Sequence, residues 1–584
     1  MRVPRRPLLL TLALLVAAPA CTHGRDGKTE VPAIVAPAEI SDLDDYAVAS
    51  NAYALLALDD PARAPLRGRL RDYLTGYLEQ AIREGRHDAA AEALEQLAGL
   101  WTPSELRSAG PDPAVSKAAD ALYQVASRTG DERPALLALG MLQVFAEPAG
   151  REQAATDYGL LVDWIERNRD FGNEPNFRDT LERLLEDVSS VFPSPFLIDA
   201  LTDSYLARHR AAQQQQGGPV DPRTTFTGYL VARAHLRADN PKAAIDALDR
   251  MQVDESTQAL RDLIADATGP EPRSAADLNQ LISEFIPTPD TRLPPAIVRQ
   301  SWGIVDNLAQ RALAKFPDDP PAQLARGRVM RSRGLHEAAI VFYERAFAAK
   351  NRASDRADLY LAWCELAELY QAVLEDRLSA DPDGAEALLA RVEAFHLRAG
   401  ETWPNQPIEP SLSTAWLTVG LSEFDAGHIE RAEHLLRNAL AVEPHPLALA
   451  LLDTIAMRRG EYDDARAWLR RLDALADGLV DQLDRYDWQI SAGVSLAEVE
   501  ALAGQTDASV EVLRETLGRL NTLLSYPGLG DSLRGEFVLR RARVFFYLGE
   551  IDLAMGDARE AQALIPERED VFSEPLIFTV MHGH

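Results

Sequence analysis

The stretch TAWLTVGLSEFDAGHIERAEHLLRNALAVEP, residues 414–444, decides the fold of this chain of 584 residues. Apolar residues recur at helical spacing from Trp416, stop at Gly427 and resume at Ala432. Spacings of three and four residues place such side chains on one face of a helix. Gly427 supplies a left-handed residue that ends the first helix, and Pro444 stops the second. The stretch therefore predicts a helix hairpin.

Small residues in this hairpin allow its two helices to approach closely. Gly420 and Ala432 lack the bulk that would hold the helix axes apart, and Trp416 fills the space between neighbours. The residues that define the whole pattern are Trp416, Gly420, Gly427, Ala432, Leu436, Ala439 and Pro444. This pattern resembles the tetratricopeptide repeat (TPR) family, whose unit is about 34 residues long. It departs from that family at Glu423, where a tyrosine is usual.

The resemblance implies an all-α fold, namely an α-solenoid of stacked helix hairpins in a right-handed superhelix. The same spacing recurs in three further sets, which are Gly327, Gly334, Ala339, Tyr343 and Ala346; Gly549, Gly556, Ala561 and Ile565; and, in partial form, Gly460, Ala465 and Leu469. Weaker echoes stand at Gly85, Ala90 and Leu94, at Gly130, Ala135 and Leu139, at Asp239, Ala244 and Leu248, and at Gly504, Ser509 and Leu513. The repeat pattern therefore extends over most of the chain.

Polar, flexible and proline-rich stretches divide the predicted array into blocks. The predicted segments are a signal peptide at 1–20, a lipid attachment site and flexible tether at 21–42, an N-terminal helical repeat block at 43–212, a central TPR-like block at 222–400, a C-terminal TPR-like block at 411–566, and a capping tail at 567–584.

The first residues have the composition of an export signal. Three arginines precede the apolar run 8–16, and Ala18-Pro19-Ala20 stands directly before Cys21. The site resembles a bacterial lipobox, although Ala18 replaces the usual aliphatic residue. This resemblance implies lipidation of Cys21 and a place in the cell envelope. Thr22 stands where an aspartate is associated with inner-membrane retention, which favours the periplasmic face of the outer membrane. Ordinary signal cleavage, which would release a free periplasmic or secreted protein, is the alternative.

The charge and the cysteine count exclude several classes. Lys+Arg 60 against Asp+Glu 90 gives a formal net charge of -30, which repels nucleic acid and anionic lipid headgroups. Only Cys21 and Cys364 are present, so a lipidated Cys21 leaves no intramolecular disulfide. No other stretch is apolar enough for a second membrane span. We therefore expect contact with a membrane only through an N-terminal lipid, and no nucleic-acid partner.

No motif in the chain carries recognisable chemistry. His428 and His434 are six residues apart, on different faces of a helix, which is the wrong spacing for a shared metal ion. Glycine-rich phosphate loops, nucleophile elbows and CxxC pairs are missing from the sequence. We therefore predict no catalytic residue, metal site or cofactor.

The inward face of the first helix of each repeat is the candidate binding surface, by resemblance to the TPR family. The candidate partner-binding residues are Leu324, Arg328, Arg331, Leu417, Leu421, Phe424 and Met457. An apolar stripe beside a basic patch suits a peptide that carries carboxylates. The alternative is that Leu421, Phe424 and Met457 pack against neighbouring helices.

Repeats fill the chain and leave no segment long enough for a catalytic domain. The sequence therefore favours a non-enzymatic scaffold that binds a protein or peptide client in the cell envelope. An accessory subunit of an envelope enzyme complex is a further reading. Neither the client nor the oligomeric state is encoded in a recognisable pattern.

Overall fold

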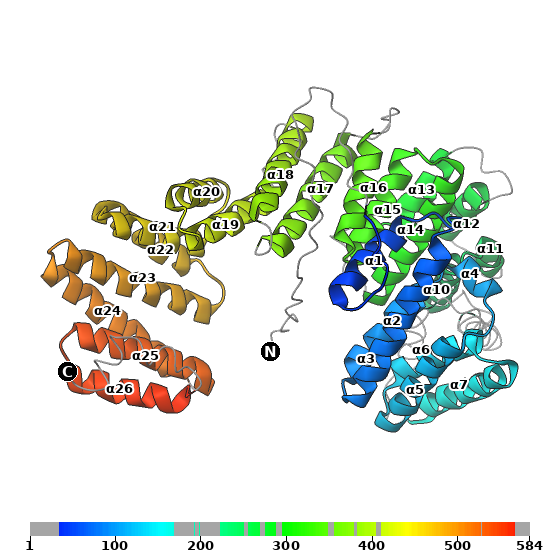
Figure 1. The fold of residues 1–584 in the computed structure, drawn as a ribbon, viewed down its shortest axis with the longest axis horizontal. Coiled ribbons are helices and arrows are strands. Elements are labelled where there is room, and N and C mark those ends of the chain that lie inside the picture. The colour runs from blue at the N-terminus through cyan, green and yellow to red at the C-terminus, as the bar shows by residue number, and fades with distance from the viewer. Residues whose placement is uncertain are drawn as a thin grey trace. The chain divides into compact units, whose positions relative to one another are not determined.

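The computed structural model describes residues 34–168, 192, 198, 222–249, 255–268, 275–287, 295–348, 356–378, 382–403, 410–526 and 528–566. These residues form 24 α-helices and, within the same ranges, no β-strand, so the predicted all-α fold is confirmed (Figure 1). The chain divides into two compact units, Met1–Leu369 (unit 1) and Tyr370–His584 (unit 2).

Among the described residues, unit 1 contains the first fourteen helices and most of the next one. Their bounds are α1 Leu43–Leu55, α2 Arg63–Arg83, α3 His87–Ala98, α4 Pro103–Ser108, α5 Pro113–Thr129, α6 Glu132–Phe145, α7 Pro148–Asn168, α10 Pro222–Arg237, α11 Pro241–Asp249, α12 Glu255–Thr268, α13 Ala275–Phe285, α14 Pro295–Lys315, α15 Pro320–Ser332, α16 His336–Ala348 and α17 Arg356–Arg377. Successive helices pack against each other in antiparallel pairs, such as α2 with α3, α5 with α6, and α15 with α16.

Unit 2 continues the same arrangement from the end of α17. Its other helices are α18 Pro382–Thr402, α19 Pro410–Asp425, α20 Ile429–Val442, α21 Pro446–Arg459, α22 Tyr462–Asp477, α23 Gln482–Leu502, α24 Thr506–Leu524, α25 Asp531–Tyr547 and α26 Ile551–Leu564. The pairs α19 with α20, α23 with α24, and α25 with α26 form its tightest hairpins.

One turn geometry closes eight of these hairpins. In each, the N–H that follows the turn residue donates to the carbonyl five residues earlier, at 2.8–3.0 Å. That bond caps the end of the first helix and requires a left-handed turn residue, which glycine adopts without a steric penalty. The turn residues, all with positive φ, are Gly85, Gly130, Asp239, Gly334, Gly427, Gly460, Gly504 and Gly549. The weaker echoes in the sequence therefore mark real hairpins.

A small buried residue follows every one of these turns at the fifth position. It lies where the second helix approaches the first, and the side chain four positions further on is buried as well. The small residues are Ala90, Ala135, Ala244, Ala339, Ala432, Ala465, Ser509 and Ala554. In the 414–444 hairpin, Ala439 is also fully buried, while Pro444 is exposed just after α20.

Two of the predicted glycines lie at close helix contacts. A Cβ on Gly420 of α19 would come within 3.2 Å of Leu436 on α20. A Cβ on Gly327 of α15 would come within 2.5 Å of the ring of Tyr343, which is fully buried on α16. Real Cβ atoms are almost never that close to another heavy atom, so the α15–α16 contact requires glycine. Trp416 is half-buried on α19, and its Nε1 donates to Glu393 of α18 at 2.7 Å.

The predicted alignment of the last hairpin is wrong by seven residues. The spacing placed Gly556 at the turn, but Gly549 makes the turn with φ 78°, and Gly556 lies inside α26 with no atom near an added Cβ. Ala561 is buried in α26 as a core residue. Glycine and alanine recur every few residues along α26, so the spacing fits two alignments. The close contact falls instead at Gly535, where a Cβ would lie 2.8 Å from Ile565.

Candidate binding site

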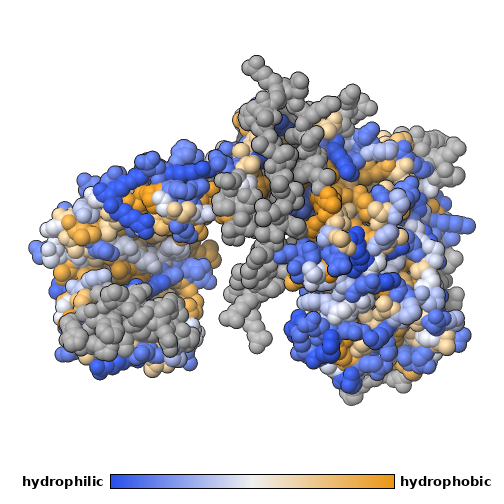
Figure 2. All heavy atoms as spheres, in the orientation of Figure 1, coloured by the Kyte–Doolittle hydropathy of each residue, from blue (hydrophilic) through white to orange (hydrophobic). Residues whose placement is uncertain are grey.

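Unit 1 contains a hollow with a volume of about 1840 Å³. Residues of α1, α2 and α3 line one part of it, residues of α14, α15 and α16 line another, and Arg237 at the end of α10 also lines it. On the face drawn in Figure 2, apolar side chains gather over the helices α15 and α16 among hydrophilic neighbours. Small-molecule pockets usually measure about 300–1,000 Å³, so this hollow has room for a larger ligand.

Aromatic side chains form the α1–α2 part of the lining. The ring centroids of Tyr46 and Tyr73 lie 5.3 Å apart, and those of Tyr73 and Tyr77 lie 6.4 Å apart, with the rings stacked. The Arg86 guanidinium lies 5.5 Å from the Tyr77 centroid. Burial raises the pKa of Tyr46 to about 12, so this phenol stays neutral. The three stacked rings of Tyr46, Tyr73 and Tyr77 form a tyrosine ladder. This ladder offers flat, uncharged surfaces on which apolar groups can pack.

Four arginines and one carboxylate are the charged residues of the α14–α16 part of the lining. Asp306 on α14 forms ion pairs with both Arg326 on α15 and Arg333 just after it, the latter at 2.7 Å. Burial, more than repulsion from Arg333, lowers the pKa of Arg326 to about 9. The Arg326 side chain is buried, whereas 40% of the Arg333 side chain is exposed. Two guanidinium groups thus share one carboxylate at the edge of the hollow.

A glycine on α14 makes room for another arginine. The side chain of Arg237, at the end of α10, lies directly over Gly303, and any Cβ there would overlap it. Asn307, one turn further along α14, donates from Nδ2 to the carbonyls of Arg237 at 2.7 Å and Leu236 at 3.3 Å. These contacts fix the end of α10 on α14.

Helix α1 closes the hollow by packing on α16, nearly three hundred residues later in the chain. The Oδ1 of Asn51 accepts a hydrogen bond from the N–H of Ala338 at 3.0 Å, in the first turn of α16. Arg326 also donates to the carbonyl of Ala54 at 3.2 Å. The Asn51 amide thereby satisfies one of the N–H groups that every helix start leaves without an intrahelical partner.

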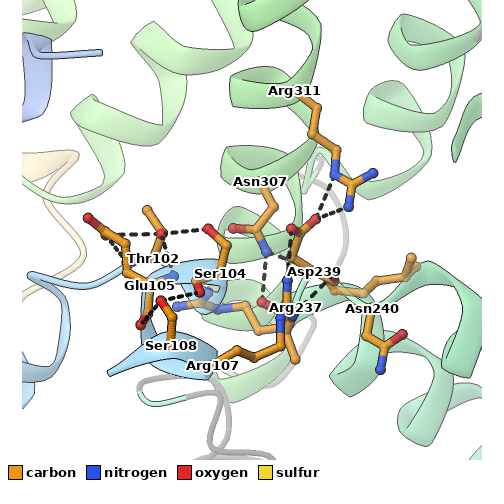
Figure 3. A network of polar contacts seen from close by, with 12 residues as sticks. Thr102, Ser104, Glu105, Arg107, Ser108, Arg237, Asp239, Asn240, Asn307 and Arg311 are labelled. Carbon is orange, nitrogen blue, oxygen red and sulfur yellow. Dashed lines mark hydrogen bonds and ion pairs between the residues drawn. The ribbon is translucent and has the colours of Figure 1, made fainter. Parts of the chain in front are cut away.

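A clamp of three charged residues joins helices on another side of unit 1 (Figure 3). Asp239, at the turn between α10 and α11, accepts a hydrogen bond from Arg311 of α14 at 2.6 Å and lies 3.5 Å from Arg107 of α4. Arg107 also donates to the carbonyl of Ala238 at 2.6 Å. Asp239 has φ 54°, at the position where the other seven hairpins have glycine. Its carboxylate connects α4, α10 and α14 at the cost of a strained backbone.

The central set of predicted client-binding residues is engaged within unit 1. Leu324 is only 6% exposed and belongs to the core, so packing accounts for this side chain and its contact with a client stays a prediction. Arg328 pairs with Glu365 of α17 at 2.9 Å, and Arg331 pairs with Glu365 at 3.5 Å and with Glu368. The predicted basic patch is therefore covered by carboxylates of α17.

The predicted set in unit 2 is half-buried. Leu417 and Phe424 of α19 pack against a cluster formed by Ala432, Leu436, Ala448, Leu452 and Ile455. Leu421 is partly exposed, and Met457 packs beside Ala456 and Leu469. The Arg458 guanidinium lies 4.7 Å from the centroid of Phe424. A packing role thus accounts for Leu417, Phe424 and Met457, and their role in binding stays a prediction.

The described residues hold no group of three or more His, Cys, Asp and Glu side chains arranged to bind a metal ion. His428 instead pairs with Glu423 at 2.7 Å, and His434 contacts Asn438. Within the described helices, none combines the length and the apolar character needed to cross a membrane. Cys21 lies outside the described residues.

The residues that line the hollow escaped prediction from the sequence, although a signal was present. Residues 326–333 read RGRVMRSR, four arginines within eight positions. Arg328 and Arg331 share one face of α15 and point to α17, whereas Arg326 and Arg333, seven positions apart, share another face and line the hollow. The resemblance to TPR proteins predicts binding by Arg328 and Arg331 and does not single out Arg326 and Arg333.

No protein-family model and no curated protein matches this sequence. Among solved structures, the chain is similar to one titled "Crystal structure of APC/C hetero-tetramer Cut9-Hcn1", at 13% identity and TM-score 0.24, over 88% of this chain and 96% of that one. It is also similar to a tetratricopeptide repeat protein from Parabacteroides merdae ATCC 43184, at 12% identity and TM-score 0.25, over 53% of this chain and 97% of that one. TM-scores this low add nothing to the hairpin geometry described above.

Proposed function

We propose that this protein is a non-enzymatic scaffold that binds a protein or peptide partner in the hollow of unit 1. The observation that carries the proposal is the hollow itself, about 1840 Å³ in volume, with stacked tyrosines on one part and arginines on another. Tyrosine and arginine are enriched at the energetic centres of protein interfaces, because each combines apolar area with directional polar groups. A hollow larger than usual small-molecule pockets suits a polypeptide segment.

A photo-reactive amino acid tests this proposal within the full chain. Placed at Trp302, which lines the hollow, it should form covalent adducts with a polypeptide when cells are irradiated. The matched control is Leu553 on α26, which is 52% exposed and lies in unit 2. Mass spectrometry identifies the adducts. A pattern that is the same at both positions, or adducts at Trp302 with no polypeptide, would contradict the proposal.

The proposed place of action is the bacterial cell envelope, with a lipid on Cys21 holding the protein at the periplasmic face of the outer membrane. The support is the sequence before Cys21, where an apolar run and small residues precede one of only two cysteines. Release as a free periplasmic or secreted protein, or service as an accessory subunit of an envelope enzyme complex, are the alternatives.

Metabolic labelling with a fatty-acid analogue tests the lipid anchor. The wild-type protein should take up the label and remain with membranes, whereas Cys21→Ser should lose both properties because it lacks the thiol. Label that persists on Cys21→Ser, or an unmodified mature N-terminus at Cys21, would favour the free form.

A further inference from the structure

The hollow of unit 1 reverses the charge of the protein around it. The whole chain has a formal net charge of -30. Among the described residues that line the hollow, six are arginines and four are carboxylates, with no lysine or histidine, which gives these residues a net charge of +2. The four carboxylates are Asp59, Glu92, Glu95 and Asp306. The hollow is therefore a small basic region in an acidic molecule.

The positive charge is concentrated on the α14–α16 part of the lining. Glu95 on α3 pairs with Arg133 at 2.5 Å, so its charge is compensated away from the arginines of α15 and α16. On the opposite part, Asp306 is the carboxylate for both Arg326 and Arg333. A carboxylate shared by two guanidinium groups leaves one positive charge uncompensated. The 40% exposure of Arg333 makes it the member of this trio that a ligand can reach.

A second exposed arginine extends the same region. The guanidinium groups of Arg326 and Arg345 lie 5.3 Å and 5.7 Å from the ring centroid of Phe342, so both contact the same aromatic side chain. Arg345 is exposed near the end of α16 and lines the hollow. Guanidinium groups held over an aromatic ring keep their N–H edges available for carboxylates.

We infer that the hollow selects an acidic peptide segment, whose carboxylates contact Arg333 and Arg345 while its apolar side chains pack on the tyrosine ladder of α1 and α2. This inference rests on the proposed function and specifies its ligand. At cellular salt, charges more than about 8 Å apart are largely screened, so the charge spread over the rest of the chain opposes the ligand only weakly. Contacts made inside the hollow are screened much less.

Selection from a displayed library of random peptides, with the full chain as bait, tests this inference. Peptides recovered from the wild-type protein should carry a net negative charge, rich in Asp and Glu, compared with the unselected library. Recovery of peptides without that bias would overturn the acidic preference and leave peptide binding intact. Failure to recover any peptide would overturn the proposed function as well.

Substitutions that should weaken and strengthen peptide binding distinguish contact with the ligand from a purely structural role. For a recovered acidic peptide, Arg333→Gln and Arg345→Gln should each weaken binding about tenfold, because each removes a contacting charge. Asp306→Asn should strengthen binding several-fold, because it removes the carboxylate that competes for Arg333. A residue that merely holds the fold together would not produce tighter binding.

Arg458→Gln in unit 2 is the matched control, since it changes the net charge of the chain equally without touching the hollow. Its dissociation constant should equal that of the wild type. Circular dichroism melts check that each variant is folded at the temperature of the assay. Unchanged binding by Arg333→Gln and Arg345→Gln, or equal weakening by Arg458→Gln, would overturn the inference.

Discussion

Units 1 and 2 are built from the same hairpin but use it differently. In unit 2, the extensive contacts join helices that are neighbours or next-but-one in the chain, from α18 to α26. In unit 1, α1 also packs on α16, and the clamp at Asp239 joins α4 to α14. Stacking alone gives a continuous surface, whereas the contact of α1 with α16 brings the two parts of the hollow's lining together. The repeat therefore specifies the hairpins, and a few distant contacts create the site.

The two units also bury different charged groups. In unit 1, Arg326 is buried beside Asp306 and Phe342. In unit 2, Asp453 of α21 is only 5% exposed, and its Oδ1 has no hydrogen-bond partner. Burial, with a smaller contribution from Glu498 of α23, raises the pKa of Asp453 to about 7. Unit 2 thus holds a buried carboxyl group with one oxygen that no described donor reaches.

The largest expected effect on stability comes from adding a Cβ at the close helix contact of unit 1, compared with the same change in unit 2. Gly327→Ala in unit 1 should lower the free energy of unfolding by about 2 to 3 kcal/mol, because its Cβ would overlap the Tyr343 ring. That ring cannot retreat freely, since its hydroxyl donates to Glu365 at 2.8 Å. Gly420→Ala in unit 2 should change the free energy of unfolding by less than about 1 kcal/mol. Its Cβ would lie 3.2 Å from Leu436, a milder overlap than at Gly327, and the higher helix propensity of alanine offsets that overlap. Denaturant titrations followed by hydrogen exchange in α15 and α19 compare the two.

Equal losses at Gly327 and Gly420 would show that the two hairpin contacts are equally tight. Gly334→Ala, at the turn of the same unit 1 hairpin, is the control for a general effect of alanine. It should cost about 1 kcal/mol through its positive φ alone, since nothing lies near its Cβ.

The second expected effect is the pH dependence of stability that comes from the buried carboxyl group of Asp453 in unit 2. The pKa of Asp453 is higher in the folded than in the unfolded chain, so the folded state holds its proton more tightly. Its contribution to stability therefore falls as the pH rises from about 4 to 7, and stays constant above that. Asp453→Asn should remove this loss and make unit 2 more stable than wild type by about 1 to 3 kcal/mol at pH 8, with little difference at pH 4.

Hydrogen exchange of α21 and α23 measures this difference within unit 2 and leaves unit 1 as an internal reference. The exposed Asp425→Asn serves as the control and should show no such pH dependence. A stability difference between Asp453→Asn and wild type that does not grow between pH 4 and pH 8 would contradict the assignment.

The difference between local hairpins and contacts distant in the chain explains what the sequence could predict. A turn glycine, a small residue five positions later and an apolar residue four beyond that are local features, so even weak echoes such as Gly85 and Ala90 marked real hairpins. The pattern predicted the wrong turn at Gly556, because small residues recur along α26 and allow two alignments. The hollow was out of reach, because the contact between Asn51 and Ala338 spans 287 residues and leaves no periodic pattern.

The smallest expected effect concerns Asp239, the residue other than glycine among the eight left-handed hairpin turns described above. Asp239→Gly removes the strain of a left-handed aspartate but also loses the contacts to Arg107 and Arg311. Partly exposed ion pairs contribute about 0.2 to 1 kcal/mol each, and a left-handed residue other than glycine costs about 1 kcal/mol, so the two changes should nearly cancel. Asp239→Ala keeps the strain and loses the contacts, and should be less stable than Asp239→Gly by about 1 kcal/mol in thermal melts. If Asp239→Gly were as unstable as Asp239→Ala, the clamp between α4 and α14 would outweigh the geometry of the turn. Ion pairs would then be what holds the helices of unit 1 together at this turn. The glycine turns of unit 2 have no side chain that could form such ion pairs.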